Sequence, residues 1–166
     1  GFGTNTLGVI DSDAGGSGNI ANEPSGETAM FFLTGTAVLN YSAGFDTGFS
    51  FFYSSSTVAS VFVYDGLDAT GNLLATLDLT AQYSDNCSGD PSGDFCNWTA
   101  VGASFAGTAY SIDFGGTVNQ IAYDDITFGS ATAGGGDDDP TPVPAPAGLA
   151  LLGLGLALIG RKRVVA

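Results

Sequence analysis

The sequence predicts an all-β protein, an antiparallel β-sandwich resembling a jelly roll, followed by a linker and one short C-terminal hydrophobic helix. Residues 1–133 alternate short runs rich in Phe, Val, Tyr, Ile and Thr with clusters of Gly, Asn, Asp and Ser. Several of these runs alternate apolar and polar side chains, which is typical of strands with one buried face. No stretch before residue 147 has a helical period, so about nine short strands are expected to form two packed sheets.

The expected strands follow one another at short intervals. They cover residues 7–10, 28–33, 36–41, 48–54, 58–65, 73–83, 97–105, 108–114 and 118–128. The run from Leu73 to Ala81 is the clearest, because Thr76, Asp78 and Thr80 separate its apolar residues. Between the fifth and sixth strands, Asp65-Gly66 and Gly71-Asn72 predict a tight hairpin loop.

The chain changes character after residue 133. Residues 134–146 are mostly Gly, Asp and Pro. The Gly and Asp residues come first and predict a flexible segment, and the Pro residues that follow predict an extended one, so the whole is expected to be a linker. Residues 147–160 have no polar side chain and predict a transmembrane helix of about 21 Å, at ~1.5 Å per residue. Residues 161–166 form a basic cytoplasmic tail, because Arg161, Lys162 and Arg163 stop the segment and place the acidic ectodomain outside.

The charge of the chain excludes several classes of function. The chain has seventeen Asp and Glu but only three Lys and Arg, which are all at 161–163, and it has no His. Without Lys or Arg the body has nothing to neutralise nucleic-acid phosphates. A Ser-His nucleophile and a His-ligated metal are equally excluded. The only two Glu, Glu23 and Glu27, share one loop, so we expect no glycosidase and no other enzyme.

Carboxylates gather in two segments that suit a structural calcium ion. Calcium takes six to eight oxygen ligands on a backbone that can bend around it. The candidate ligands are Glu23, Glu27, Asp124, Asp125, Asp11 and Asp13. The long loop is not an EF-hand, because Gly15 stands at its fifth position, where an acid or amide belongs, and Asn22 stands at its twelfth, where Glu belongs. A solvated turn and an exposed strand end without metal remain open as alternatives.

Asp124 and Asp125 lie on the last expected strand. Strict alternation places Asp124 on the same face as Ile126 and Phe128. A carboxylate on a core-facing row needs a partner. Because the body has no Lys, Arg or His, that partner must be a metal ion, a backbone amide or a hydroxyl.

Two further features lie near each other in the sequence. Cys87 and Cys96 flank a Pro- and Gly-containing loop and are expected to form a disulfide after export. Trp98 follows this loop and is either a platform for a sugar ring or part of the core.

The C-terminal region resembles the PEP-CTERM sorting domain of Gram-negative bacteria. The resemblance is carried by Val143, Pro144, Ala145 and Pro146, then the apolar segment, then Arg161-Lys162-Arg163. Ala145 departs from the Glu of the family motif, which leaves the cleavage position open. The resemblance implies export, transient anchoring in the inner membrane, processing by an exosortase, and delivery to the cell surface or extracellular (biofilm) matrix.

The body resembles the jelly-roll ectodomains found with such tails, and also carbohydrate-binding modules. The resemblance is carried by residues 49–53, 61–66, 71–72 and 121–129. The leading hypothesis is therefore a non-catalytic, structural or adhesive surface protein. The alternatives are a carbohydrate-binding module for exopolysaccharide and a subunit that assembles with copies of itself into extracellular filaments.

Overall fold

The computed structural model describes residues 1–84, 87–88 and 93–134, and its regular elements are all β-strands. This confirms the all-β class and the expected number of strands. The strands are β1 (Thr6–Ile10), β2 (Thr28–Phe32), β3 (Ala37–Phe45), β4 (Gly48–Ser55), β5 (Ala59–Tyr64), β6 (Leu73–Leu79), β7 (Thr99–Ser104), β8 (Ala109–Phe114) and β9 (Ile121–Phe128).

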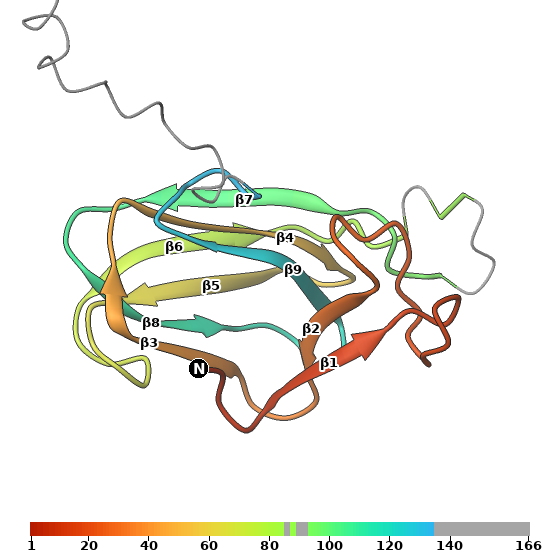
Figure 1. Cartoon of the computed structure of the whole chain (residues 1–166), viewed down its shortest axis with the longest axis horizontal. Helices are drawn as coiled ribbons and strands as arrows, with labels where there is room; N and C mark the ends of the chain where they lie inside the picture. Colours follow the sequence, from red (N-terminus) through yellow and green to blue (C-terminus); the bar gives the residue numbers. More distant parts are fainter. Residues whose placement is uncertain (85–86, 89–92, 135–166) are drawn as a thin grey trace, which may run out of the picture. The chain divides into compact units, whose positions relative to one another are not determined.

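The strands form two antiparallel sheets packed face to face (Figure 1). One sheet has the order β1-β2-β9-β4-β7 and the other has the order β3-β8-β5-β6. Apart from the hairpin of β5 and β6 within one sheet, consecutive strands from β2 to β9 alternate between the sheets. This is the arrangement of an eight-stranded jelly roll, which confirms the expected architecture. Strand β1 is an addition that pairs with the outer edge of β2.

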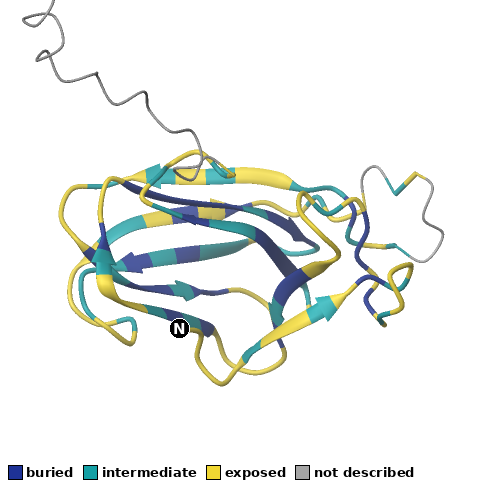
Figure 2. Ribbon diagram, viewed as in Figure 1, coloured by how far each residue is buried: buried dark blue, intermediate teal, exposed yellow. Residues whose placement is uncertain are grey.

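The core lies between the sheets, where the buried segments of neighbouring strands face each other (Figure 2). Period-two alternation supplies these residues, as in β5, where Val61 and Val63 are fully buried and their neighbours are partly exposed. Aromatic rings fill the centre: Phe51 contacts Phe114 at 5.9 Å and Tyr123 at 5.4 Å between ring centroids. Offset and edge-to-face contacts of this kind stabilise a core beyond the area that they bury.

A bulge in β9 interrupts the alternation that the sequence suggests. Phe52 pairs with Asp124 and Ser50 pairs with Thr127. Only one residue of β4 lies between the two pairs, whereas β9 has two, so β9 carries one extra residue. Asp125 takes the left-handed backbone conformation, with φ 48°. The extra residue reverses the faces: Ile126 and Phe128 pack against the core, whereas Asp124 lies on the outer face with Ala122. The expectation that Asp124 shares the face of Ile126 and Phe128 was therefore wrong.

Residues 135–166 lie outside the described part of the structure. The predictions for the linker, the Val143–Pro146 motif, the hydrophobic segment 147–160 and the basic tail fall there and stay predictions. Among the described residues, no helix has the length and apolar character needed to cross a bilayer.

Candidate functional site

Three carboxylates of the loop between β1 and β2 converge at one end of the sandwich. One ligand oxygen each from Asp11, Glu23 and Glu27 lies within 4.8 Å of the others. Calcium binds oxygens at about 2.3–2.6 Å, so two ligands on opposite sides of one ion are about 5 Å apart. The three carboxylates are therefore close enough to share a calcium ion.

The carboxylate of Glu23 has the surroundings of a cation ligand. Its Oε1 atom is buried and has no hydrogen-bond partner among the described residues. Burial raises the pKa of Glu23, and the charges of Asp11, Glu27 and Asp124 raise that pKa further. A cation would remove both unfavourable effects, since it would bind the buried oxygen and neutralise the surrounding charge.

Asp124 links this loop to β9. Its Oδ2 accepts a hydrogen bond from the Ser25 N–H at 3.0 Å, and its Oδ1 accepts from the Ser25 hydroxyl at 3.0 Å. The N–H of Asp125 donates to Oδ1 as well, at 2.7 Å. The partners of this buried carboxylate are thus a hydroxyl and backbone amides, two of the three kinds that the sequence allowed.

The other two candidate ligands lie apart from the group of three. Asp13 donates its backbone N–H to Asp11 Oδ1 at 3.1 Å and so supports a ligand. Asp125 lines a cleft instead. Their direct binding of a metal stays a prediction without support from this geometry.

The disulfide expected between Cys87 and Cys96 is present, which confirms that prediction. The segment that it closes supports the acidic loop, because the Asn19 carbonyl accepts from the N–H groups of Asp94 and Phe95 at 2.8 and 3.0 Å. Trp98 adds a third support: its indole N–H donates to the Ala21 carbonyl at 2.8 Å.

Trp98 packs against the small cluster formed by Ile20, Ala29 and Ala122. The structure therefore gives its partly buried ring a packing role, and the alternative of a sugar platform at Trp98 stays a prediction.

A cleft of about 770 Å³ opens at the edge of the sandwich where β1, β2 and β9 of one sheet face β3 of the other. Gly1 and Phe2 form part of its wall. Their segment pairs with β3: the Gly3 N–H donates to the Val38 carbonyl at 2.8 Å, and Phe2 pairs with Leu39. A volume in this range is usual for a site that binds a small ligand.

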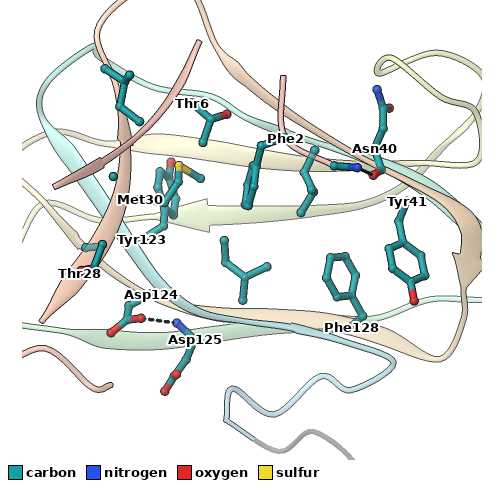
Figure 3. A pocket seen from close by; sticks show the side chains of 16 residues that line it. Phe2, Thr6, Thr28, Met30, Asn40, Tyr41, Tyr123, Asp124, Asp125 and Phe128 are labelled. Atoms are coloured by element: carbon teal, nitrogen blue, oxygen red, sulfur yellow. Dashed lines mark hydrogen bonds between the residues drawn. The ribbon is translucent and has the colours of Figure 1, made fainter. Parts of the chain in front are cut away.

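Aromatic rings lie along the middle of the cleft, and polar groups lie at its ends (Figure 3). Phe2 is 48% exposed and Tyr41 is 41% exposed, which is high for large rings. Tyr41 stacks on Phe128 with ring centroids 4.9 Å apart. Asn40, beside Tyr41, marks one end, and Asp124 and Asp125 mark the other (Figure 3).

The sequence did not identify this cleft. Three of its aromatic residues, Phe2, Tyr41 and Phe128, are 39 and 87 positions apart and belong to an N-terminal segment, to β3 and to β9. The sequence carried no local signal for it, because Asn40 and Ser42 on either side of Tyr41 are the ordinary alternation of a strand with one buried face.

No protein-family model and no curated protein matches the chain. Among solved structures, the chain is similar to CsCBM6-3 from Clostridium stercorarium in complex with cellobiose. That likeness has 16% identity and a TM-score of 0.47 over 78% of this chain and 86% of that one. A family 6 carbohydrate-binding module studied by binding sub-site dissection has 13% identity and a TM-score of 0.45, with the same coverage. At these values, neither likeness assigns a ligand or a family to this chain.

Proposed function

We propose that the β-sandwich is a non-catalytic carbohydrate-binding module of an exported surface or matrix protein. The observation that carries the proposal is the cleft with the exposed rings of Phe2 and Tyr41 between polar ends. A sugar ring has apolar C–H faces and a polar hydroxyl rim. Aromatic side chains flanked by a few hydrogen-bonding groups match that distribution.

The cleft also favours binding over a purely structural role. An apolar cleft of this size, left open to water, costs free energy that a covering ligand would recover. The sequence before Arg161 has no His, Lys or Arg, and its two Glu share one loop, so a Ser-His nucleophile and a basic catalytic group are excluded. Binding without turnover is therefore the activity that this chemistry supports best.

Calorimetric titration of the full chain with oligosaccharides measures their dissociation constants and tests the proposal. Phe2→Ala and Tyr41→Ala should each weaken binding about tenfold or more, because exposed aromatic anchors dominate small interfaces. Val58→Ala is the matched control, since Val58 is 75% exposed and does not line the cleft. If no neutral, amino or acidic oligosaccharide binds the unaltered chain, the proposal is wrong. Concentration-dependent assembly in the same samples would then favour the filament subunit.

The proposal includes a calcium ion held by Asp11, Glu23 and Glu27. The support is their mutual approach within 4.8 Å together with the buried, unpartnered Oε1 of Glu23. The ion would stabilise the loop that Ser25 connects to Asp124, next to the end of the cleft. Its role would be structural, because these ligands lie in one loop and the sequence before Arg161 has no His, Lys or Arg to accompany them.

Export rests on the sequence of the C-terminal region. The Val143–Pro146 motif, the apolar segment and the basic cluster resemble a signal for exosortase processing after transient inner-membrane anchoring. In the producing bacterium, the chain should appear in the surface or matrix fraction. Replacing both Pro144 and Pro146 with Ala should leave it in the inner membrane. Equal release of both forms would contradict sorting through this motif.

A further inference from the structure

The charge around the cleft restricts the kind of sugar that it can bind. No Lys, Arg or His is among the described residues that line the cleft. The Gly1 amine, which also lies in the lining, donates to the Asn40 carbonyl. Two carboxylates, those of Asp124 and Asp125, lie at one end of it (Figure 3). A ligand that carries carboxylate or sulfate groups would meet like charge there and would find no cationic side chain to pair with.

Asp125 differs from Asp124 in what its carboxylate contacts. Both oxygens of Asp124 accept hydrogen bonds from Ser25, so this carboxylate is occupied by the protein itself. No hydrogen bond to the carboxylate of Asp125 is found among the described residues. Its side chain therefore has acceptor capacity left for a ligand.

The β9 bulge fixes the position of Asp125. The backbone N–H of Asp125 donates to Asp124 Oδ1 at 2.7 Å, and its carbonyl accepts from the Thr127 hydroxyl at 2.9 Å. Bulges often re-aim one side chain out of the regular pattern of a strand. Here the bulged residue is an acid at the end of an aromatic cleft, and its backbone is held on both sides.

We propose that the cleft prefers an amino sugar, whose protonated amine binds the carboxylate of Asp125. This inference rests on the proposed function and names the chemical class of its ligand. An ammonium group supplies the charged donors that a carboxylate pairs with best. The sugar ring would then lie along Phe2 and Tyr41, as any sugar in this cleft would.

Two trisaccharides that differ only in the group at issue provide the test. A β-1,4-linked glucosamine trimer carries amines where the corresponding glucose trimer carries hydroxyl groups. At low ionic strength the full chain should bind the glucosamine trimer, the amine form, about tenfold more tightly than the glucose trimer. The reason is that charge-assisted hydrogen bonds are markedly stronger than neutral ones. A uronic-acid trimer should bind more weakly than the glucose trimer.

Asp125→Asn isolates the carboxylate without changing its shape. Asn tolerates the left-handed backbone conformation of this position, so the bulge should persist. The variant should bind the glucose trimer as the unaltered chain does, while the preference for the amine form falls to about twofold or less. Asp78→Asn is the matched control, because Asp78 is an exposed acid on β6 that bonds to Ser60 and does not line the cleft.

The outcomes separate this inference from the proposed function. If the glucose trimer binds and the amine form binds no more tightly, the amino-sugar preference is wrong and carbohydrate binding stands. A preference lost equally in Asp78→Asn and Asp125→Asn would also overturn it, because general charge attraction would then be the cause. If none of the three trimers binds the unaltered chain, carbohydrate binding itself is contradicted.

Discussion

Adding calcium to the metal-free chain is expected to raise its free energy of unfolding by about 2.6 kcal/mol. Two unit charges 4.8 Å apart repel by about 0.9 kcal/mol at the dielectric constant of water and by about 3.5 kcal/mol at an effective value of 20. The carboxylates of Asp11, Glu23 and Glu27 form three such pairs. The value in water is the lower limit of the repulsion that a shared cation would offset.

Mass action sets the calcium concentration that is needed for an effect of this size. A ligand that binds only the folded state adds about 2.7 kcal/mol when its free concentration is 100 times its dissociation constant. For a domain of this size, that corresponds to a rise of about 10 °C in melting temperature. The assay is thermal unfolding of the full chain in chelator, in calcium and in magnesium. Magnesium should act more weakly, because it requires rigid octahedral geometry and keeps its water ligands.

Glu23→Gln separates repulsion from metal binding. The folded pKa of Glu23 is raised above the usual 4.5, chiefly by burial. Its contribution to stability is therefore greatest below pH 4.5 and is lost as the pH rises through the folded pKa. In chelator at neutral pH the variant should be more stable than the unaltered chain, and it should respond less to calcium. The difference between the two chains should vanish in acid.

Asp13→Asn is the control for this experiment. Asp13 belongs to the same loop and loses the same charge, but its carboxylate is not among the three that converge. The calcium response of this variant should be unchanged. The reasoning would be refuted if chelated and calcium-loaded chains were equally stable at millimolar calcium, or if Asp13→Asn removed the response as fully as Glu23→Gln.

Two further predictions concern the scaffold. Tyr123→Phe should lower the free energy of unfolding by about 1–2 kcal/mol, because the buried Gly115 carbonyl loses its hydrogen bond at 3.0 Å. Burial raises the pKa of the Tyr123 hydroxyl far above its usual range, so the hydroxyl stays protonated at neutral pH. Denaturant unfolding should therefore show the same loss of unfolding free energy throughout the neutral range. A loss that depends on pH would contradict this. Replacing Cys87 and Cys96 together with Ser should cost about 2.5 kcal/mol, since the bond closes a loop of about ten residues. Thermal unfolding of the oxidised chain and the double variant measures this effect, and equal melting temperatures would contradict it.

The fold class could be predicted from the sequence because its signals are local. Alternation with period two, as at Val61 and Val63, determines which face of a strand is buried. Gly- and Asp-rich turns separate the strands. The expected strands and the observed ones differ mainly at their ends. The disulfide was predictable for the same reason, since both cysteines belong to one short loop.

The chemistry that the body lacks was also determined by sequence alone. A chain with no His and no basic residue before Arg161 cannot build the sites that need them, whatever its fold. Composition also indicated a cation, because carboxylates without internal partners repel one another. It could not choose among six candidate ligands.

Only the tertiary structure decided which residues meet. Asp11 approaches Glu23 and Glu27 because the loop folds back on itself, and Ser25 reaches Asp124 across 99 positions of sequence. The cleft likewise joins Phe2, Tyr41 and Phe128 from three separate segments. The bulge at Asp125 reversed the faces of β9, and no local pattern marks where a single extra residue enters a ladder. Strand pairing and bulges depend on partners distant in the chain, so periodicity predicts the strands but not the site that their packing creates.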